Sequence, residues 1–363
     1  MKKIIEQSIK TPGEITSAAS AFIEGRRSKL LRYAIGKNSE TLSLHHFMPL
    51  DGIIDDYAAQ GEYWHEIPLL HTENANKNGC VVNCSTSIRP VDTLNHLLAS
   101  GFRNVINLYD LVLAAEGSLS QPEFVTQQRN EMAEHIEVWQ SIHDSLEDDI
   151  SRKTLIDVLL FRLTANPAHM ENYSVRINEQ YFEDFMEYRN EVFVDAGGFD
   201  GDTAEEFAKR YPDYQKILLF EPSDRNMELA RHRLSRLRDI TFFPVGLSNS
   251  AGRLRFDQQA GSASSISDSG DDEIVVDSLD SMVTEPISFI KMDLEGWELA
   301  ALEGSRRHIG EDRPKLAIAV YHKASDLRQI YQFVKSFGHK YKMFLRHYTQ
   351  GWSETVLFFV PRD

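Results

Sequence analysis

The chain has 363 residues, of which 42% are hydrophobic and 26% are charged, as in a water-soluble globular protein. This length exceeds what one hydrophobic core usually supports, so we expect more than one domain. The formal net charge of −16 disfavours nucleic acid and anionic lipid surfaces as partners. No apolar run approaches the 18 residues that a membrane-spanning helix needs.

The N-terminal residues and the cysteines favour a cytoplasmic protein. Lys2 and Lys3 are not followed by the apolar stretch of a secretory signal. The only two cysteines, Cys80 and Cys84, lie four positions apart in a predicted strand, and no further Cys or His cluster completes a metal site. We therefore expect two reduced thiols in a hydrophobic core.

A small α/β module is predicted for residues 1–120. Residues 80–84 read as a buried strand, residues 91–100 as a helix that Gly101 ends, and residues 105–108 as a second strand. This βαβ pattern lacks a glycine-rich nucleotide-binding turn, so it predicts no cofactor.

A helical connector is predicted for residues 121–180. Apolar positions recur with a period near 3.6 over residues 123–138 and 151–163, which is typical of helices packed on one face. The pair Asn166-Pro167 is expected to end the second helix.

Strands and helices alternate through residues 181–363. The predicted strands cover 192–196, 216–220, 240–245, 287–292, 316–321, 340–345 and 355–360. The predicted helices cover 202–210, 224–237, 297–303 and 325–337, with polar loop and short strands over 253–285. The pattern predicts a Rossmann-like α/β domain whose seven-stranded sheet is mostly parallel, with an antiparallel pair at one edge.

The turn after the first of these strands, within residues 192–202, is the most informative motif. An apolar run ends at Asp195, and glycines including Gly197 and Gly201 lead into a helix that begins at Asp202. A strand, a glycine-rich turn and a helix open the nucleotide-binding α/β folds. The carboxylates in this turn would repel phosphates but suit a cationic nucleoside such as S-adenosylmethionine.

Two further carboxylates follow later strands. Glu221 comes directly after the second strand, where an acid can accept hydrogen bonds from ribose hydroxyls. Asp293 ends the fourth strand, whose end is expected beside that of the first. Glu295 and Glu298 follow closely, and acids at this place can also cap the next helix, so both roles stay open for them.

These motifs resemble the FkbM family of S-adenosylmethionine-dependent methyltransferases. The resemblance covers roughly residues 190–310. It rests on segments 194–197, 201–203, 220–222 and 245–248, and above all on Lys-Met-Asp-Leu-Glu-Gly-Trp-Glu at 291–298. It implies a class I methyltransferase fold and O-methylation, often of a sugar in a glycan, polysaccharide or natural product. The first 175 residues lie outside it.

The resemblance also implies roles for individual residues. Asp195 and Gly197 would hold the methionine end of S-adenosylmethionine, Glu221 would bind the ribose, and Asp293 would line the donor pocket or the acceptor site. The predicted cofactor-binding residues are Asp195, Gly197, Gly201, Asp202, Thr203, Glu221 and Asp293.

Methylation of a hydroxyl calls for a base, because the oxygen is a poor nucleophile until its proton is leaving. A positioned base contributes about 10²–10⁴ in rate. The candidates are Asp293, Glu295 and His322, which ends the fifth predicted strand. A divalent metal held by Asp293 and Glu295 stays open, but two carboxylates alone fall short of a site, so no metal is predicted.

Two other functions stay open. An NAD-dependent sugar-nucleotide oxidoreductase would use Glu221 equally well, although Asp195, Asp202 and the incomplete glycine pattern count against it. A non-catalytic scaffold with a methyltransferase fold would not need these carboxylates. The expected acceptor is a carbohydrate or another small hydroxylated molecule. The N-terminal module is expected to bind the acceptor or a partner subunit, which leaves a homo-oligomer open.

Overall fold

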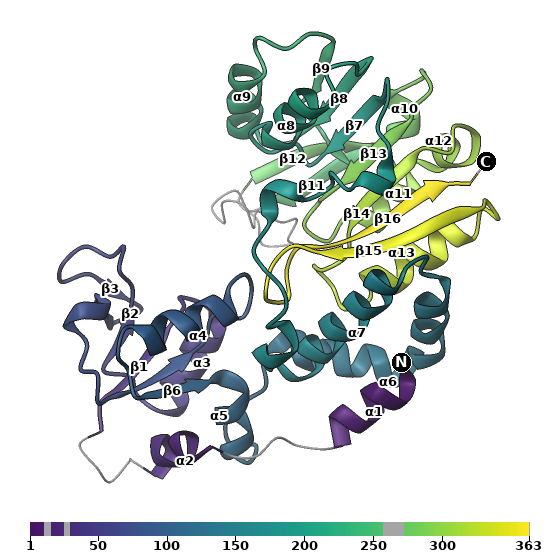
Figure 1. Ribbon diagram of the computed structural model, residues 1–363. Coiled ribbons are helices and arrows are strands. Elements are labelled where there is room, and N and C mark those ends of the chain that lie inside the picture. Colours follow the sequence, from purple (N-terminus) through teal and green to yellow (C-terminus); the bar gives the residue numbers. More distant parts are fainter. Residues whose placement is uncertain (11–15, 25–29, 257–271, 363) are drawn as a thin grey trace. The chain divides into compact units, whose positions relative to one another are not determined.

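The computed structural model describes residues 1–10, 16–24, 30–256 and 272–362, and it divides the chain into two compact units (Figure 1). The first unit comprises residues 1–140, 153–177 and 347–353, and the second comprises residues 141–152, 178–346 and 354–363. Among the described residues, no helix has both the length and the apolar character that crossing a membrane requires.

A six-stranded sheet forms the centre of the first unit, in the order β3-β4-β2-β1-β5-β6. Its strands are β1 (Arg32–Ile35), β2 (Gly52–Ile54), β3 (Tyr63–Trp64), β4 (Ile67–Leu70), β5 (Cys80–Asn83) and β6 (Asn104–Asn107). All pairs are parallel except β3 with β4. The sequence indicated only β5 and β6. It missed β1 and β4, which are equally long, and β2 and β3, which have three and two residues.

Helices alternate with these strands along the chain, and further helices follow the last strand. They are α1 (Lys2–Lys10), α2 (Ser17–Glu24), α3 (Ser39–Phe47), α4 (Pro90–Ala99), α5 (Leu108–Ala114), α6 (Glu123–Ser145) and α7 (Asp149–Thr164). Short 3-10 turns lie at Thr72–Asn74, Pro167–Met170, Ile177–Glu179 and Asp184–Met186. The helices predicted at 91–100, 123–138 and 151–163 are confirmed, but α6 continues seven residues further, past a non-helical residue at His135.

Both cysteines belong to the core of the first unit. Cys80 and Cys84 are free and buried. Burial raises the pKa of the Cys84 thiol to about 12, so this thiol stays protonated at neutral pH.

The second unit is built on a seven-stranded sheet, in the order β15-β16-β14-β13-β7-β8-β9 (Figure 1). Its strands are β7 (Val192–Ala196), β8 (Lys216–Phe220), β9 (Ile240–Phe243), β13 (Phe289–Met292), β14 (Lys315–Ala319), β15 (Tyr341–His347) and β16 (Thr355–Pro361). The pairs from β9 across to β14 are parallel, and β16 is antiparallel to β14. The mostly parallel seven-stranded sheet predicted from the sequence is therefore confirmed.

Six helices accompany this sheet within the described residues: α8 (Asp202–Arg210), α9 (Asp224–Arg233), α10 (Leu279–Met282), α11 (Glu298–Glu303), α12 (Arg306–Glu311) and α13 (Asp326–Lys335). The prediction missed α10 and α12, which have only four and six residues. A small sheet combines β10 (Gly246–Leu247), β12 (Asp272–Asp277) and β11 (Gly252–Phe256). Residues 257–271 of the predicted polar segment lie outside the described part of the chain.

The register of the three central strands brings their ends to one edge. Ala196 of β7 pairs with Met292 of β13 on one side and with Phe220 of β8 on the other. Because all three strands are parallel, the residues that follow them leave the sheet at the same level. The turn after β7, Glu221 and Asp293 therefore meet at this edge, as the sequence predicted.

The end of α11 provides a test of how tightly this unit is packed. A Cβ at Gly304 would lie 2.0 Å from the backbone oxygen of Ser248, whereas a Cβ at Gly310 would make only ordinary contacts at 3.7 Å. We expect Gly304→Ala to lower the free energy of unfolding by about 1–3 kcal/mol. Gly310→Ala, within α12, should raise it by about 0.5–1 kcal/mol. Urea unfolding of both variants checks this, and equal midpoints would contradict it.

Candidate active site

The turn after β7 admits glycine alone at its closest point. Gly197 has a φ of +74°, and a Cβ there would lie 2.0 Å from the backbone oxygen of Asp293. Gly201 has a φ of +85° and precedes the first residue of α8. In that first turn, the exposed Asp202 accepts a hydrogen bond from the Thr203 N–H at 2.6 Å.

A buried ion pair lies beneath this turn. The carboxylate of Asp195 is fully buried, and its Oδ1 lies 3.1 Å from Nζ of Lys291 on β13. Burial alone would lower the pKa of Lys291, but the carboxylates of Asp195 and Asp293 raise it, so the lysine is charged. The same ammonium donates to the Gly197 carbonyl oxygen at 2.8 Å. Asp195 therefore supports the turn through Lys291, from inside the protein.

Glu221 links the end of β8 to the same turn. Its carboxylate accepts hydrogen bonds from the N–H groups of Phe199 at 3.0 Å and Ser223 at 2.9 Å. The residue is only 6% exposed, and burial raises the pKa of its carboxyl group. The carboxylate that the sequence assigned to ribose binding thus lies directly beside the glycine turn.

Two tyrosine hydroxyls hold Asp293. Tyr181 donates to Oδ2 of Asp293 at 2.8 Å, and Tyr321 donates to Oδ1 at 3.3 Å. Tyr181 is buried, with a φ of +74°. These donors fix the orientation of the carboxylate at the sheet edge, next to the turn.

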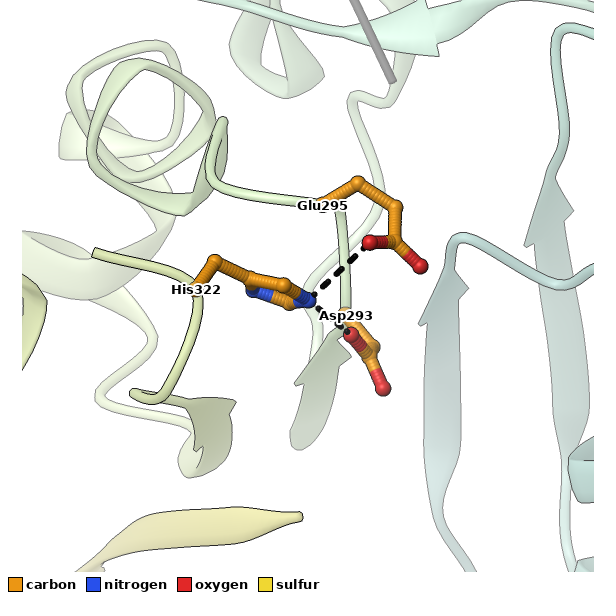
Figure 2. A group of neighbouring side chains, drawn as sticks. All are labelled: Asp293, Glu295 and His322. Atoms are coloured by element: carbon orange, nitrogen blue, oxygen red, sulfur yellow. Dashed lines mark ion pairs between the residues drawn. The ribbon is translucent and has the colours of Figure 1, made fainter. Parts of the chain in front are cut away.

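The three candidate bases converge on one point. Figure 2 shows the imidazole of His322 directed at Asp293 and Glu295. Its Nε2 lies 3.5 Å from Oδ1 of Asp293 and 3.3 Å from Oε2 of Glu295, and its Nδ1 lies 3.1 Å from Oε1 of Glu298. Burial alone would lower the pKa of His322, but the carboxylates of Glu295 and Glu298 raise it well above its ordinary value. The cluster therefore attracts a positive charge.

The backbone between β13 and α11 presents Glu295 to this cluster. Glu295 has a φ of +52° and Gly296 a φ of +88°, so two successive residues are left-handed. Glu298 accepts hydrogen bonds from the N–H groups of Leu294 at 2.7 Å and Gly296 at 3.3 Å. Glu298, which is 1% exposed, thus stabilises the turn before α11, while the side chain of Glu295 stays 31% exposed.

Several residues of the site escaped the sequence prediction. Glu354, which precedes β16, accepts a hydrogen bond from Gln180 at 2.9 Å. Burial and the charge of Asp293 raise the pKa of Glu354 to about 7. Tyr181 and Glu354 lie in segments without a motif and reach Asp293 only through the fold. Lys291 belongs to the motif at 291–298, but only the strand register shows that it lies opposite Asp195 in the pairing of β13 with β7.

The strand order, the glycine turn after the central strand and the carboxylates after its neighbours define a class I methyltransferase fold. Residues 195–341 match the family model described as a methyltransferase FkbM domain. This match confirms, for residues 195–341, the resemblance seen in the sequence.

One solved structure supports this fold along nearly its whole length. Methyltransferase FkbM from Methylobacillus flagellatus KT is similar over 99% of this chain and 98% of its own, with a TM-score of 0.75 and 24% sequence identity. Aeropyrum pernix fibrillarin, in complex with S-adenosyl-L-methionine, aligns over 47% of this chain and 67% of its own, with a TM-score of 0.33 and 13% identity. No curated protein matches the sequence.

The raised pKa of Glu354 predicts a pH-dependent stability. A carboxyl group whose pKa rises from 4.5 to about 7 on folding stabilises the protein fully below pH 4.5, and this contribution is lost as the pH rises to 7. The amide side chain of the Glu354→Gln variant does not titrate, so its stability does not fall with pH in this way. We expect this variant to gain stability relative to the unmodified protein by about 2–3 kcal/mol between pH 4.5 and pH 7.5.

Thermal unfolding of both proteins across this pH range measures the difference. The exposed Glu303→Gln variant on α11 is the matched control and should follow the unmodified protein at every pH. A difference between Glu354→Gln and the unmodified protein that stays constant with pH would contradict the prediction.

Proposed function

We propose that this protein is an S-adenosylmethionine-dependent O-methyltransferase that methylates a hydroxyl of a carbohydrate or of another small hydroxylated acceptor. The observation that carries the proposal is the convergence of Gly197, Glu221 and Asp293 after the neighbouring strands β7, β8 and β13. In open α/β sheets, ligands bind outside the carboxyl ends of the strands, where the strand order reverses. β7 is the strand at which this order reverses.

The residues around the glycine turn suit the proposed donor. Gly197 leaves the backbone bare at the point of closest approach, and Glu221 offers a carboxylate of the kind that binds ribose hydroxyls. Gly201, Asp202 and Thr203 shape the start of α8. Asp195 would act on the donor through Lys291 and the turn. When bound, S-adenosylmethionine supplies an electrophilic methyl group on a sulfonium centre.

The cluster of Asp293, Glu295 and His322 is the proposed place where the acceptor hydroxyl is activated. Hydroxyl oxygens become good nucleophiles only as the proton leaves, and a positioned base contributes about 10²–10⁴ in rate. Alignment of the reacting atoms supplies much of the remainder. The tyrosine hydroxyls on Asp293 support this role, because they hold the carboxylate in one orientation beside the donor turn.

We propose a division of labour along the chain. Residues 181–363 would act as the methyltransferase domain, residues 1–120 would bind the acceptor or a partner subunit, and residues 121–180 would connect them. The proposed place of action is the cytoplasm. The turn does not favour NAD, because its pyrophosphate would meet the carboxylate of Asp202 at the start of α8.

Binding of S-adenosylhomocysteine tests the donor site. We expect micromolar affinity by calorimetric titration, and Glu221→Gln should weaken it at least about tenfold, or about 1.4 kcal/mol, by replacing the proposed ribose acceptor. Asp195→Asn should also weaken it, since the turn loses the ion pair that supports Lys291.

The exposed Glu228→Gln variant on α9 is the control for the change of charge, and it should bind like the unmodified protein. Circular dichroism verifies that each variant is folded. Absence of binding by the folded, unmodified protein would overturn the proposed function, and binding of NAD instead would favour the oxidoreductase.

A further inference from the structure

We propose that Asp293, Glu295 and His322 bind a divalent cation, and that this cation holds the acceptor hydroxyl. One ligand atom from each residue lies within 4.8 Å of the others (Figure 2). Asp293 follows β13 at the sheet edge, beside the glycine turn. The cation site stands on the geometry of these three side chains. Its role toward an acceptor rests on the proposed function.

The spacing of the ligand atoms fits an ion between them. Nε2 of His322 lies 3.3 Å from Oε2 of Glu295 and 3.5 Å from Oδ1 of Asp293. Two ligand atoms about 2.0–2.2 Å from one ion are about 3.0–3.5 Å apart in tetrahedral or octahedral geometry. The side chains therefore need little movement to become ligands.

His322 supplies an independent sign of a ligand. Its side chain is 10% exposed, yet among the described residues neither ring nitrogen makes a hydrogen bond of acceptable geometry. Burial of an imidazole is costly when its polar neighbours lack hydrogen-bond geometry, because ion pairs alone do not fully replace the lost water. Nε2 is directed at the gap between Asp293 and Glu295, so an ion there would satisfy it (Figure 2).

The other ring nitrogen faces a carboxylate that can orient the ring. Nδ1 lies 3.1 Å from Oε1 of the buried Glu298. Histidines that bind metals almost always direct their second ring nitrogen at a carboxylate or carbonyl, which leaves the metal-binding nitrogen unprotonated. Glu298 is itself held by two backbone N–H groups of the turn. When an ion displaces the Nε2 proton into solvent, this arrangement directs the Nε2 lone pair toward Asp293 and Glu295.

The opposite side of the ring suits an ion less well. Glu298 and Asp326 also lie close to His322 there. Asp326, however, already accepts a hydrogen bond from the Lys323 N–H at 2.6 Å, and both carboxylates are nearly inaccessible, at 1% and 5% exposure. On the Nε2 side, Glu295 and Asp293 keep 31% and 21% of their side chains exposed. Within the described part of the chain, the Nε2 side is therefore the more accessible one.

Three protein ligands leave coordination positions for an acceptor. Two carboxylates and one imidazole suit Mn²⁺, Mg²⁺ or Zn²⁺. A hydroxyl bound at an open position becomes more acidic. Water shows the same effect, because its pKa falls from 15.7 to about 7 when it binds zinc. The O–H bond of the acceptor hydroxyl then breaks, the electron pair stays on oxygen, and the proton passes to the second carboxylate oxygen of Glu295, which remains the proposed base. The acceptor class expected is one with two adjacent oxygens, such as a vicinal diol, which can chelate the ion.

Titration of the whole protein with Mn²⁺ tests the site without any methyl transfer. Electron paramagnetic resonance of free Mn²⁺ should report one bound ion per chain. Asp293→Asn, Glu295→Gln and His322→Gln should each weaken binding at least about tenfold, because each removes one ligand. Asp326→Asn, on the other side of the ring, and the exposed Glu303→Gln should stay within about twofold.

Separate titration with S-adenosylhomocysteine distinguishes this site from the donor site. Folded Glu295→Gln and His322→Gln should bind S-adenosylhomocysteine like the unmodified protein while losing Mn²⁺, because neither residue belongs to the proposed donor set. No Mn²⁺ binding tighter than about 1 mM, binding that survives both substitutions, or binding lost in Asp326→Asn would overturn the cation site. Mn²⁺ binding without S-adenosylhomocysteine binding would overturn only the proposed function.

Discussion

The ion pair between Asp195 and Lys291 joins the two strands on which the site is built. The two residues face each other across the pairing of β7 with β13, both inside the sheet. Removing one partner would leave the other charge buried and uncompensated, which strongly lowers the free energy of unfolding. Lys291 also donates a hydrogen bond to the Gly197 carbonyl oxygen, so the ion pair holds the glycine turn in place as well. The proposed donor and acceptor sides of the site thus share this buried ion pair.

Negative charge dominates the edge of the sheet outside this pair. Asp293, Glu295 and Glu298 surround a single imidazole, and Glu354 lies close to Asp293. Concentrating carboxylates in this way costs electrostatic energy, so proteins keep such clusters where a cation offsets it. Because Tyr181 and Tyr321 offer only neutral hydroxyls, they orient Asp293 without cancelling its charge.

Much of the second unit could be read from the sequence. Its strands are apolar runs buried on both faces, and the carboxylates at 195, 221 and 293 follow them directly, so a parallel sheet must gather them at one edge. Two things could not be read. Strands β2 and β3, with three and two residues, are too short for their period to stand out. Tyr181 and Glu354 approach Asp293 from 112 residues before it and 61 after it, and no local pattern encodes such a contact.

The place of β16 has a consequence for how the second unit forms. This strand follows all the others in the chain, yet it lies inside the sheet, between β14 and β15. A ribosome therefore releases β15 before the strand that must separate it from β14 exists. Until residues 355–361 emerge, β14 has an open edge, and Glu354 has no strand to hold it beside Asp293. Non-local pairing of this kind makes folding slow, and the unfinished sheet edge is exposed to other chains in the meantime. The site of this unit is thus completed only when β16 joins the sheet.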